Sequence, residues 1–244
     1  MTNTIAKALR GASAALLATT ALVPGAMPGS MAAVAQDRAP ATEALVDLVN
    51  PLMGSDSSYE LSYGNTYPAV AVPWGMNFWT PVTGKMGSGW GYTYAAHKIN
   101  GIKQTHQPSP WMNDYAAFAL FAETGPLKVK EEERASWFSH KAEDSRPYRY
   151  KVYLADYDVT AEVTPTERAA QFRFTFPKAD DAHIILDAYN GGSMVQIDPV
   201  KRRITGYVRN NHGGVPDNFH NYFVAEFDHD FTCLLYTSPS PRDS

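Results

Sequence analysis

Aromatic side chains are concentrated between Tyr59 and Asp114, interleaved with glycine, proline and polar residues. Such loops suit sugar binding, because a pyranose packs its apolar C–H faces on rings while its hydroxyl groups need polar partners. Core packing is the alternative. We expect core positions for Trp74 and Trp79, which lie on strand-like stretches, and sugar contacts for Trp90 and Trp111, which are flanked by glycine or proline.

Other polar groups are weaker candidates for chemistry. Asp228-His229-Asp230 contains metal-ligand types, but alternation along a strand puts the histidine opposite both carboxylates, which favours a solvated edge. Asp156 and Asp158 are expected in a turn rather than as a catalytic pair. His140 is interpreted as a structural hydrogen-bonding residue rather than a base. Neither a G-x-S-x-G elbow nor a phosphate-binding loop occurs.

The elements that would position these residues are short strands between turn signals. Residues 171–176 alternate polar and phenylalanine side chains, which is typical of a half-buried antiparallel strand. No stretch outside the first 35 residues keeps helical periodicity for 12 residues, so the sequence predicts an all-β fold, a β-sandwich. Strands are expected over residues 67–72, 76–80, 116–122, 148–154, 158–164, 170–176, 183–187, 203–209 and 222–227.

The first residues have the pattern of a secretory signal. Lys7 and Arg10 precede a mostly apolar or small stretch, and Ala33-Val34-Ala35 offers a cleavage site. We expect a signal peptide over residues 1–35, a spacer over 36–44 and a folded domain over 45–232. The protein is then exported, to the periplasm or the extracellular space of a bacterium, and no segment is expected to span a membrane.

The end of the chain has a different pattern. Residues 233–243 match the translation of a synthetic transposon sequencing adaptor codon for codon, so residues 233–244 are interpreted as an artefactual tail rather than a Ser/Pro linker. Cys233, the one cysteine, lies in this tail, and no disulfide framework is expected. The net charge of −4 gives no reason to expect nucleic acid or an anionic membrane as a partner.

Ordered motifs over nearly all of residues 45–230 resemble glycoside hydrolase family 92, whose members are exo-acting α-mannosidases. The resemblance runs through residues 46–54, 64–68 (Gly-Asn-Thr-Tyr-Pro), 72–76 (Val-Pro-Trp-Gly-Met), 91–94, 99–106, 138–140 and 157–168. The chain departs from the commoner family pattern at Ala69, at Trp74 and in the loop over residues 102–111. A different substrate-facing loop leaves the preferred mannoside linkage open.

The resemblance implies that residues 45–232 are the family's N-terminal β-sandwich, of the supersandwich-like type. It also implies calcium-dependent, inverting hydrolysis of a terminal α-mannoside. Both catalytic carboxylates and the Ca²⁺ ligands are expected in an (α/α)6 catalytic domain that would follow and is missing here, so this chain holds no catalytic or metal-binding residue. The N-terminal domain would contribute substrate-binding loops, for which we expect Gly64, Asn65, Trp90, His106, Ser109 and Trp111.

The leading hypothesis is therefore a truncated N-terminal domain of a secreted exo-α-mannosidase, inactive alone. Its expected partners are mannose-containing glycans and the missing catalytic domain, whose absence would leave an exposed apolar patch. A free-standing lectin-like carbohydrate-binding module is the alternative, and a purely architectural sandwich with core aromatics is the third hypothesis.

Overall fold

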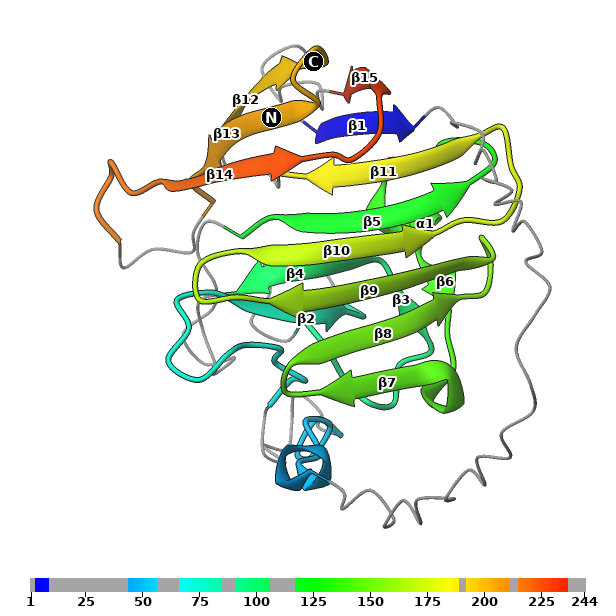
Figure 1. Cartoon of the computed structure of the whole chain (residues 1–244), viewed down its shortest axis with the longest axis vertical. Helices are drawn as coiled ribbons and strands as arrows, with labels where there is room; N and C mark the ends of the chain where they lie inside the picture. Colours follow the sequence, from blue (N-terminus) through cyan, green and yellow to red (C-terminus); the bar gives the residue numbers. More distant parts are fainter. Residues whose placement is uncertain are drawn as a thin grey trace, which may run out of the picture.

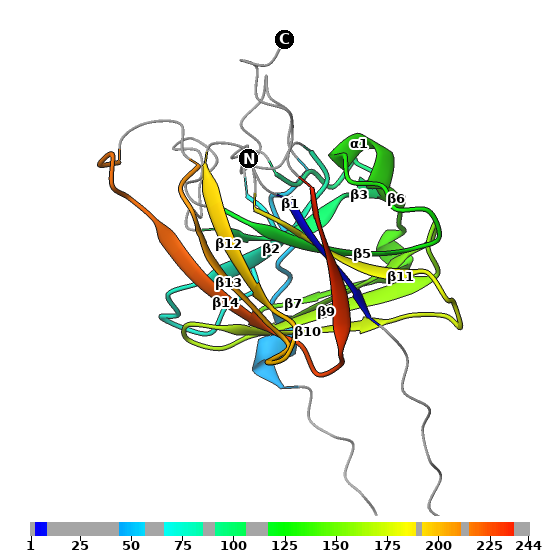
Figure 2. The ribbon, with the colours of Figure 1, turned by 90° about the horizontal axis from the view of Figure 1, so that it is seen from above.

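The computed structural model describes residues 3–8, 44–56, 66–84, 91–105, 117–188, 192–210 and 215–236, with the backbone alone for residues 3–8. Within these ranges every strand pairing is antiparallel. The result is the β-sandwich that the sequence predicts (Figures 1 and 2).

The larger layer is a six-stranded sheet in the order β15-β1-β11-β5-β4-β2. Neighbours in this sheet are far apart in sequence, and β11 pairs with β5 over its whole length. The strands are β1 (Asn3–Ala8), β2 (Phe78–Val82), β4 (Gly101–Thr105), β5 (Ala119–Thr124), β11 (Ala182–Asp187) and β15 (Phe231–Tyr236).

The second layer is a meander of four strands in the order β10-β9-β8-β7. Alternation explains its burial, because β8 buries every second side chain and β9 buries the positions paired with them, as at Val152↔Ala161. Phe172, Phe174 and Phe176 share the partly buried face, as predicted. The strands are β7 (Glu143–Arg146), β8 (Arg149–Leu154), β9 (Val159–Pro165) and β10 (Ala170–Thr175).

The core lies between these two layers, which Figure 2 shows from above. Trp79 on β2 meets Phe118, just before β5, edge to face at 5.7 Å, and Phe172 on β10 edge to face at 4.9 Å. Trp79 is only 5% exposed, so its predicted core role is confirmed. A tryptophan that contacts both sheets fixes how one packs on the other.

A third sheet extends one end of the sandwich. It holds β12 (Ser193–Asp198), β13 (Arg203–Val208) and β14 (Asn221–Glu226), and Phe223 of β14 stacks on Phe118 at 4.9 Å. The remaining described elements are short: 3-10 helices η1 (Leu45–Leu48) and η3 (His140–Ala142), helix α1 (Glu131–Arg134), and the paired strands β3 (Lys98–Ile99) and β6 (Ser136–Trp137).

Two local predictions are wrong. The strand expected over residues 67–72 is reduced to one bridge, Val70↔Trp79, because Pro68 lacks an N–H group and Ala69 donates back to the Tyr67 carbonyl in a tight turn. Trp74 is not in the core. Its side chain is 98% exposed on a turn that Gly75 N closes to the Val72 oxygen, and its φ of 61° lies in the left-handed region.

The predicted ends also contribute strands. The backbone of β1, within the predicted signal peptide, pairs with β11 and β15, and β15 crosses the predicted boundary between residues 232 and 233. Those boundaries stay predictions. No helix in the part of the chain described is both long and apolar enough to cross a membrane.

Candidate functional site

The six residues expected to bind sugar all lie outside the described residues. Gly64 and Asn65 fall in residues 57–65, Trp90 in residues 85–90, and His106, Ser109 and Trp111 in residues 106–116. Their assignment stays a prediction. The structure does describe the residues at which these three segments begin and end, and we call these residues the segment bases.

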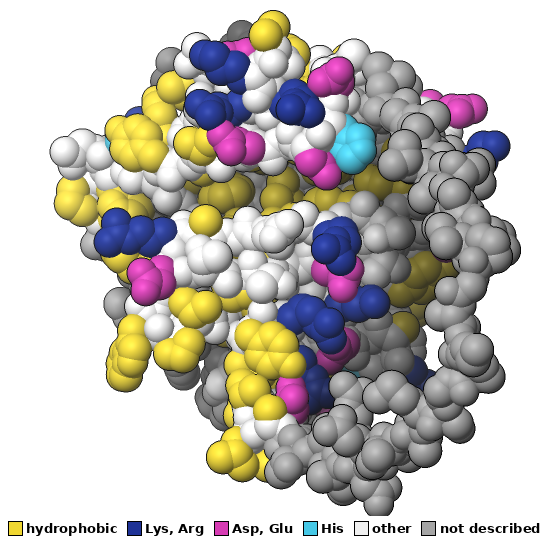
Figure 3. Space-filling model, viewed as in Figure 1, with side chains coloured by type: hydrophobic (Ala, Val, Ile, Leu, Met, Phe, Trp, Pro, Cys, Tyr) yellow, Lys and Arg dark blue, Asp and Glu magenta, His cyan; other side chains and the backbone are white. Residues whose placement is uncertain are grey.

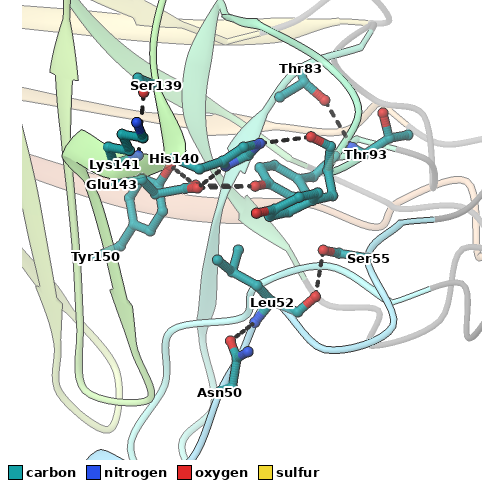
Figure 4. A network of polar contacts seen from close by, with 12 residues as sticks. Asn50, Leu52, Ser55, Thr83, Thr93, Ser139, His140, Lys141, Glu143 and Tyr150 are labelled. Carbon is teal, nitrogen blue, oxygen red and sulfur yellow. Dashed lines mark hydrogen bonds and ion pairs between the residues drawn. The ribbon is translucent and has the colours of Figure 1, made fainter.

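The base of segment 57–65 is a hydrogen-bonded turn. Asn50 Oδ1 accepts from Leu52 N at 3.0 Å, and Ser55 Oγ donates to the Leu52 oxygen at 2.6 Å (Figure 4). On the far side, Thr66 Oγ1 donates to the Met53 oxygen at 2.9 Å. The two ends are therefore tied together, because Met53 precedes the segment and Thr66 follows it.

The base of segment 85–90 is closed in the same way. The backbone nitrogens of Thr83 and Gly84 both donate to the Gly91 oxygen, at 2.6 and 3.1 Å. Thr93 N donates to Thr83 Oγ1 at 2.9 Å, and Asn100 Nδ2 donates to the Gly84 oxygen at 2.8 Å. Gly91, the residue after Trp90, is thereby held against the end of β2.

The base of segment 106–116 is held by one buried amide. Asn210, 4% exposed, accepts from Ala117 N at 3.1 Å and donates to the Ala117 oxygen at 2.7 Å. At the next residue, the Phe118 oxygen accepts a hydrogen bond from Gln104 N of β4 at 2.9 Å. The segment therefore leaves from β4 and returns beside it.

The three bases are joined to one another. Tyr94 N donates to the Ser55 oxygen at 2.9 Å, which connects segments 57–65 and 85–90. The hydroxyls of Tyr67 and Thr105 lie 3.1 Å apart, which connects segments 57–65 and 106–116. The sandwich thus anchors in one region all three segments that carry the predicted residues. Function often lies on loops held by such a rigid scaffold.

Glu143 is the centre of the polar network beside these bases (Figure 4). Its side chain is fully buried. It accepts from Tyr150 Oη at 2.6 Å and from Tyr92 Oη at 3.1 and 3.3 Å, and its Oε2 lies 2.6 Å from His140 Nδ1. His140 Nε2 lies 2.7 Å from the Tyr94 oxygen, and the His140 and Tyr94 rings stack at 3.8 Å. The first strand of the meander thereby holds the chain that follows segment 85–90.

The two phenols of this network stay protonated. Burial raises the pKa of Tyr150 well above its usual value, and the neighbouring Glu143 charge adds to the rise. The pKa of Tyr92 is raised by the same two causes in the same order. Both hydroxyls therefore donate hydrogen bonds, and neither is suited to remove a proton.

A second buried polar cluster lies around α1. Arg134, fully buried, donates from Nη2 to Asp187 Oδ2 at 2.7 Å, from Nε to the Asn100 oxygen and from Nη1 to the Val129 oxygen. Nearby, Glu123 accepts from Lys128 N at 2.7 Å. Burial raises the pKa of Glu123, against the lowering effect of Lys128 and Arg134. The direct protein partners of Arg134 indicate a structural role.

The weaker candidates lie in turns. Asp228 and His229 lie in the bend between β14 and β15, where they form an exposed pair at 2.8 Å. The solvated position expected for them is confirmed, but the expected strand, with the histidine opposite the carboxylates, is wrong. Asp156 and Asp158 lie in the turn between β8 and β9, where Asp158 Oδ1 accepts from Tyr153 Oη. Among the described ranges, no group of three or more His, Cys, Asp and Glu side chains could hold a metal ion.

The sequence pattern did not identify Glu143, the centre of the polar network. Tyr92 and Tyr94 belong to the aromatic-rich stretch between Tyr59 and Asp114, but Glu143 lies in a polar run, Glu143–Arg146, that resembles a solvated strand. Its partners are 3, 7 and 51 residues away. The one local signal was a histidine three residues before a carboxylate.

Comparisons with known proteins agree with this architecture. Residues 48–240 match the model of the glycosyl hydrolase family 92 N-terminal domain, a range that includes the start of the predicted tail. A search of curated proteins gives no match. A solved family GH92 inverting mannosidase from Bacteroides thetaiotaomicron is 45% identical with a TM-score of 0.72, over 80% of this chain and 30% of that one.

A family GH92 α-mannosidase of the same organism is also similar. It is 31% identical with a TM-score of 0.62, over 78% of this chain and 26% of that one. A structure of it in complex with mannoimidazole gives 29% identity and a TM-score of 0.61, over 76% and 25%. This chain therefore spans less than a third of the length of these relatives. With its β-sandwich and the match over residues 48–240, the chain belongs to glycosyl hydrolase family 92, as an N-terminal domain of that family.

Proposed function

We propose that this chain contributes substrate-binding loops to a secreted, calcium-dependent, inverting exo-α-mannosidase and is inactive alone. The similarity to an inverting mannosidase, at 45% identity over 80% of this chain, carries the proposal. The joined bases of segments 57–65, 85–90 and 106–116 support it, because these described residues, at which the three segments begin and end, are hydrogen-bonded to one another. Mannose-containing glycans are the proposed ligands.

The bond-breaking step is assigned to the remainder of the enzyme. Inversion requires two carboxyl groups about 6.5–9.5 Å apart, one to protonate the leaving oxygen and one to activate water. The best-positioned buried carboxylates here do not suit it. Glu143 is enclosed by Tyr92, Tyr150 and His140, and Glu123 is fully buried below the sheet surface. The chain's own residues would bind and orient the sugar.

Calcium is proposed for the intact enzyme only. A Ca²⁺ ion takes six to eight oxygen ligands, mostly carboxylates and carbonyls. The described ranges bring together no three acidic or histidine side chains for it. No step involving this chain's residues depends on the ion, and its ligands are proposed to lie in the catalytic domain.

An apolar surface offers a place for that domain to dock. It surrounds η1 and the turn between β7 and β8, where Asp47 accepts from Tyr148 Oη at 2.6 Å, and Ala71 N donates to the Pro147 oxygen at 3.0 Å. Figure 3 shows hydrophobic side chains over η1 and over the neighbouring loop before β2. Highly exposed members are Leu45, Leu48, Met53, Trp74 and Met76. Exposed patches of this kind mark interaction sites.

Export is proposed through cleavage after Ala35. N-terminal sequencing of the secreted chain is then expected to begin at Gln36. Cleavage would also remove β1 from between β11 and β15. A mature protein that still begins at Met1 would refute the assignment of residues 1–35 as a signal peptide.

Glycan binding tests the site. The full chain should bind mannan in a titration, and Trp90→Ala and Trp111→Ala should each weaken binding, since a stacked ring contributes about 1 kcal/mol or more. Trp137→Ala is the matched control, because that ring is 51% exposed and stacks on His97 instead. Equal binding by all variants would sink the site assignment. Strong binding with full specificity by the chain alone would favour a lectin-like module.

A further inference from the structure

The outer face of the third sheet carries exposed rings beside uncharged polar side chains. Two rows of outward-facing residues cross β12, β13 and β14, the first being Met194, Tyr207 and Tyr222 and the second Gln196, Thr205 and Val224. Directly opposite residues of neighbouring strands share one face of a sheet. Tyr222 is 73% exposed, whereas its neighbour Phe223 is buried on the inner face. We call these two rows the outer platform.

The rings of the platform are braced from one side. Tyr207 meets His220 edge to face with ring centroids 4.4 Å apart, and it meets Tyr222 edge to face at 5.8 Å. His220 Nδ1 donates to the Asn218 oxygen at 2.7 Å, which holds the imidazole in turn. The Tyr222 ring is therefore supported before any ligand arrives, and binding orders few additional side chains.

Charged side chains lie beyond the platform, at the other end of the sheet. The next row consists of Asp198, Arg203 and Glu226. Arg203 pairs with Glu226 at 2.5 Å, and Asp198 pairs with Lys201 at 3.4 Å. Figure 3 shows hydrophobic side chains over the beginning of β14 and charged side chains toward its end. The platform therefore suits an uncharged ligand.

The size of the platform favours a small ligand over a protein. Neighbouring strands lie about 4.8 Å apart and same-face residues about 7 Å apart, so the two rows cover on the order of 100 Å². A standard protein interface buries about 800 Å² on each partner. A pyranose presents apolar C–H faces and a rim of hydroxyl groups, which match the platform's rings and its amide and hydroxyl side chains.

The platform borders the base of segment 106–116. Asn221, which precedes Tyr222 on β14, donates from Nδ2 to Gln104 Oε1 of β4 at 2.7 Å. Asn210, which follows β13, holds both backbone groups of Ala117. A glycan of several sugar rings that lies on the platform is thus close to the segment bases.

We propose that the outer platform is a second carbohydrate-binding site, where Tyr222 stacks on a sugar ring of an uncharged polysaccharide and Gln196 and Thr205 bind its hydroxyl groups. The choice of α-mannan rests on the proposed function, whereas the preference for an uncharged, polyhydroxylated ligand rests on the platform alone. A polymer that contacts the platform and the loops together is held more tightly than a disaccharide at either place, because its second contact is intramolecular.

Titration calorimetry of the full chain with α-mannan tests the proposal. Tyr222→Val should weaken binding about fivefold, because valine keeps an apolar, strand-forming side chain but removes the ring. Tyr222→Trp should bind at least as well as the wild type. Tyr153→Ala is the matched control, since this tyrosine is also exposed, at 38%, but lies on β8. Binding of α-mannobiose, which is assigned to the loops, should be equal in the wild type and Tyr222→Val.

The wild type gives a second measurement that needs no variant. On addition of α-mannan, the ring ¹H NMR signals of Tyr207 and Tyr222 should shift, and those of Tyr153 should not. Unshifted Tyr222 signals at saturating mannan overturn the platform proposal, even if the variants do not fold.

The outcomes separate this proposal from the proposed function. If Tyr222→Val weakens mannan binding but Trp90→Ala and Trp111→Ala do not, the platform is upheld and the loop site fails. The reverse pattern overturns the platform and upholds the loop site. A wild-type chain that binds no mannan overturns both. Dimerisation of the wild type that Tyr222→Val abolishes also overturns the platform, because this face would then join two copies of the chain.

Discussion

Replacing Arg134 by methionine should destabilise the sandwich more than any surface change. The guanidinium is fully buried and donates to Asp187, Asn100 and Val129, and Asp187 is itself only 4% exposed. Methionine fills similar volume, so the cost comes from polar groups. Neutral hydrogen bonds contribute about 0.5–1.5 kcal/mol and charged ones about 1.5–3 kcal/mol. Removing one partner of a buried ion pair costs about 3–5 kcal/mol, and we expect Arg134→Met to lower the free energy of unfolding by this amount.

Urea unfolding of the full chain, followed by tryptophan fluorescence, measures the loss of free energy, and thermal unfolding measures the matching fall in melting temperature. In a domain of this size 1 kcal/mol corresponds to about 2–4 °C, so the melting temperature should fall by roughly 10 °C. Arg173→Met is the matched control, because its side chain is 73% exposed and lies 4.0 Å from Glu162. It should change stability by less than about 0.5 kcal/mol.

A double variant tests the reason as well as the size. Arg134→Met with Asp187→Leu removes both charges, so it should lose less stability than the two single changes added together. A loss below about 1 kcal/mol for Arg134→Met, or strict additivity in the double variant, would refute the argument that an uncompensated buried charge sets the cost.

Three smaller changes test other parts of the fold. Trp74→Gly should be about 1 kcal/mol more stable to urea than Trp74→Ala, because glycine adopts the φ of 61° without strain; equal stabilities would contradict this. Burial raises the pKa of Glu123, so the protonated carboxyl stabilises the folded state. This contribution to the free energy of unfolding is fully present below the usual carboxyl pKa and is lost as pH rises through the raised value. Glu123→Gln should therefore flatten the wild-type fall in melting temperature over that range, and an unchanged pH profile would argue against it. Asn210→Ala should cost about 2 kcal/mol in thermal unfolding by freeing both backbone groups of Ala117, and a loss below about 0.5 kcal/mol would count against that clamp.

Local patterns predicted the meander well and the six-stranded sheet poorly. β8, β9 and β10 are consecutive and alternate cleanly, so the sequence shows both their positions and their inner faces. In the larger sheet, β5 pairs with β11 and β4 with β2, and local periodicity carries no information about partners so distant. β4 was missed because Lys103 and Gln104 interrupt its apolar pattern, although Lys103 is only 2% exposed.

Trp74 and Trp79 show the same limit at single residues. Both were expected in the core on strand-like stretches, but Trp74 lies on the turn that Gly75 closes and is 98% exposed, whereas Trp79 lies on β2 and is 5% exposed. The Glu143 network needed the fold, because a carboxylate on β7 meets Tyr92 only after the sheets have packed. Loop composition allows a prediction of where sugar would bind, but it does not show which buried residues hold the ends of those segments.

Ligand-observed NMR of an α-mannobiose solution containing the full chain tests the central claim most directly, because one spectrum reports both binding and turnover. The disaccharide signals are expected to broaden in the presence of the wild-type chain, and no free mannose is expected to form over time. With the Trp90→Ala and Trp111→Ala double variant the signals should stay sharp. Release of mannose, stopped by a calcium chelator, would show that the chain itself carries the chemistry. Sharp disaccharide signals at every protein concentration would instead contradict its role in substrate binding.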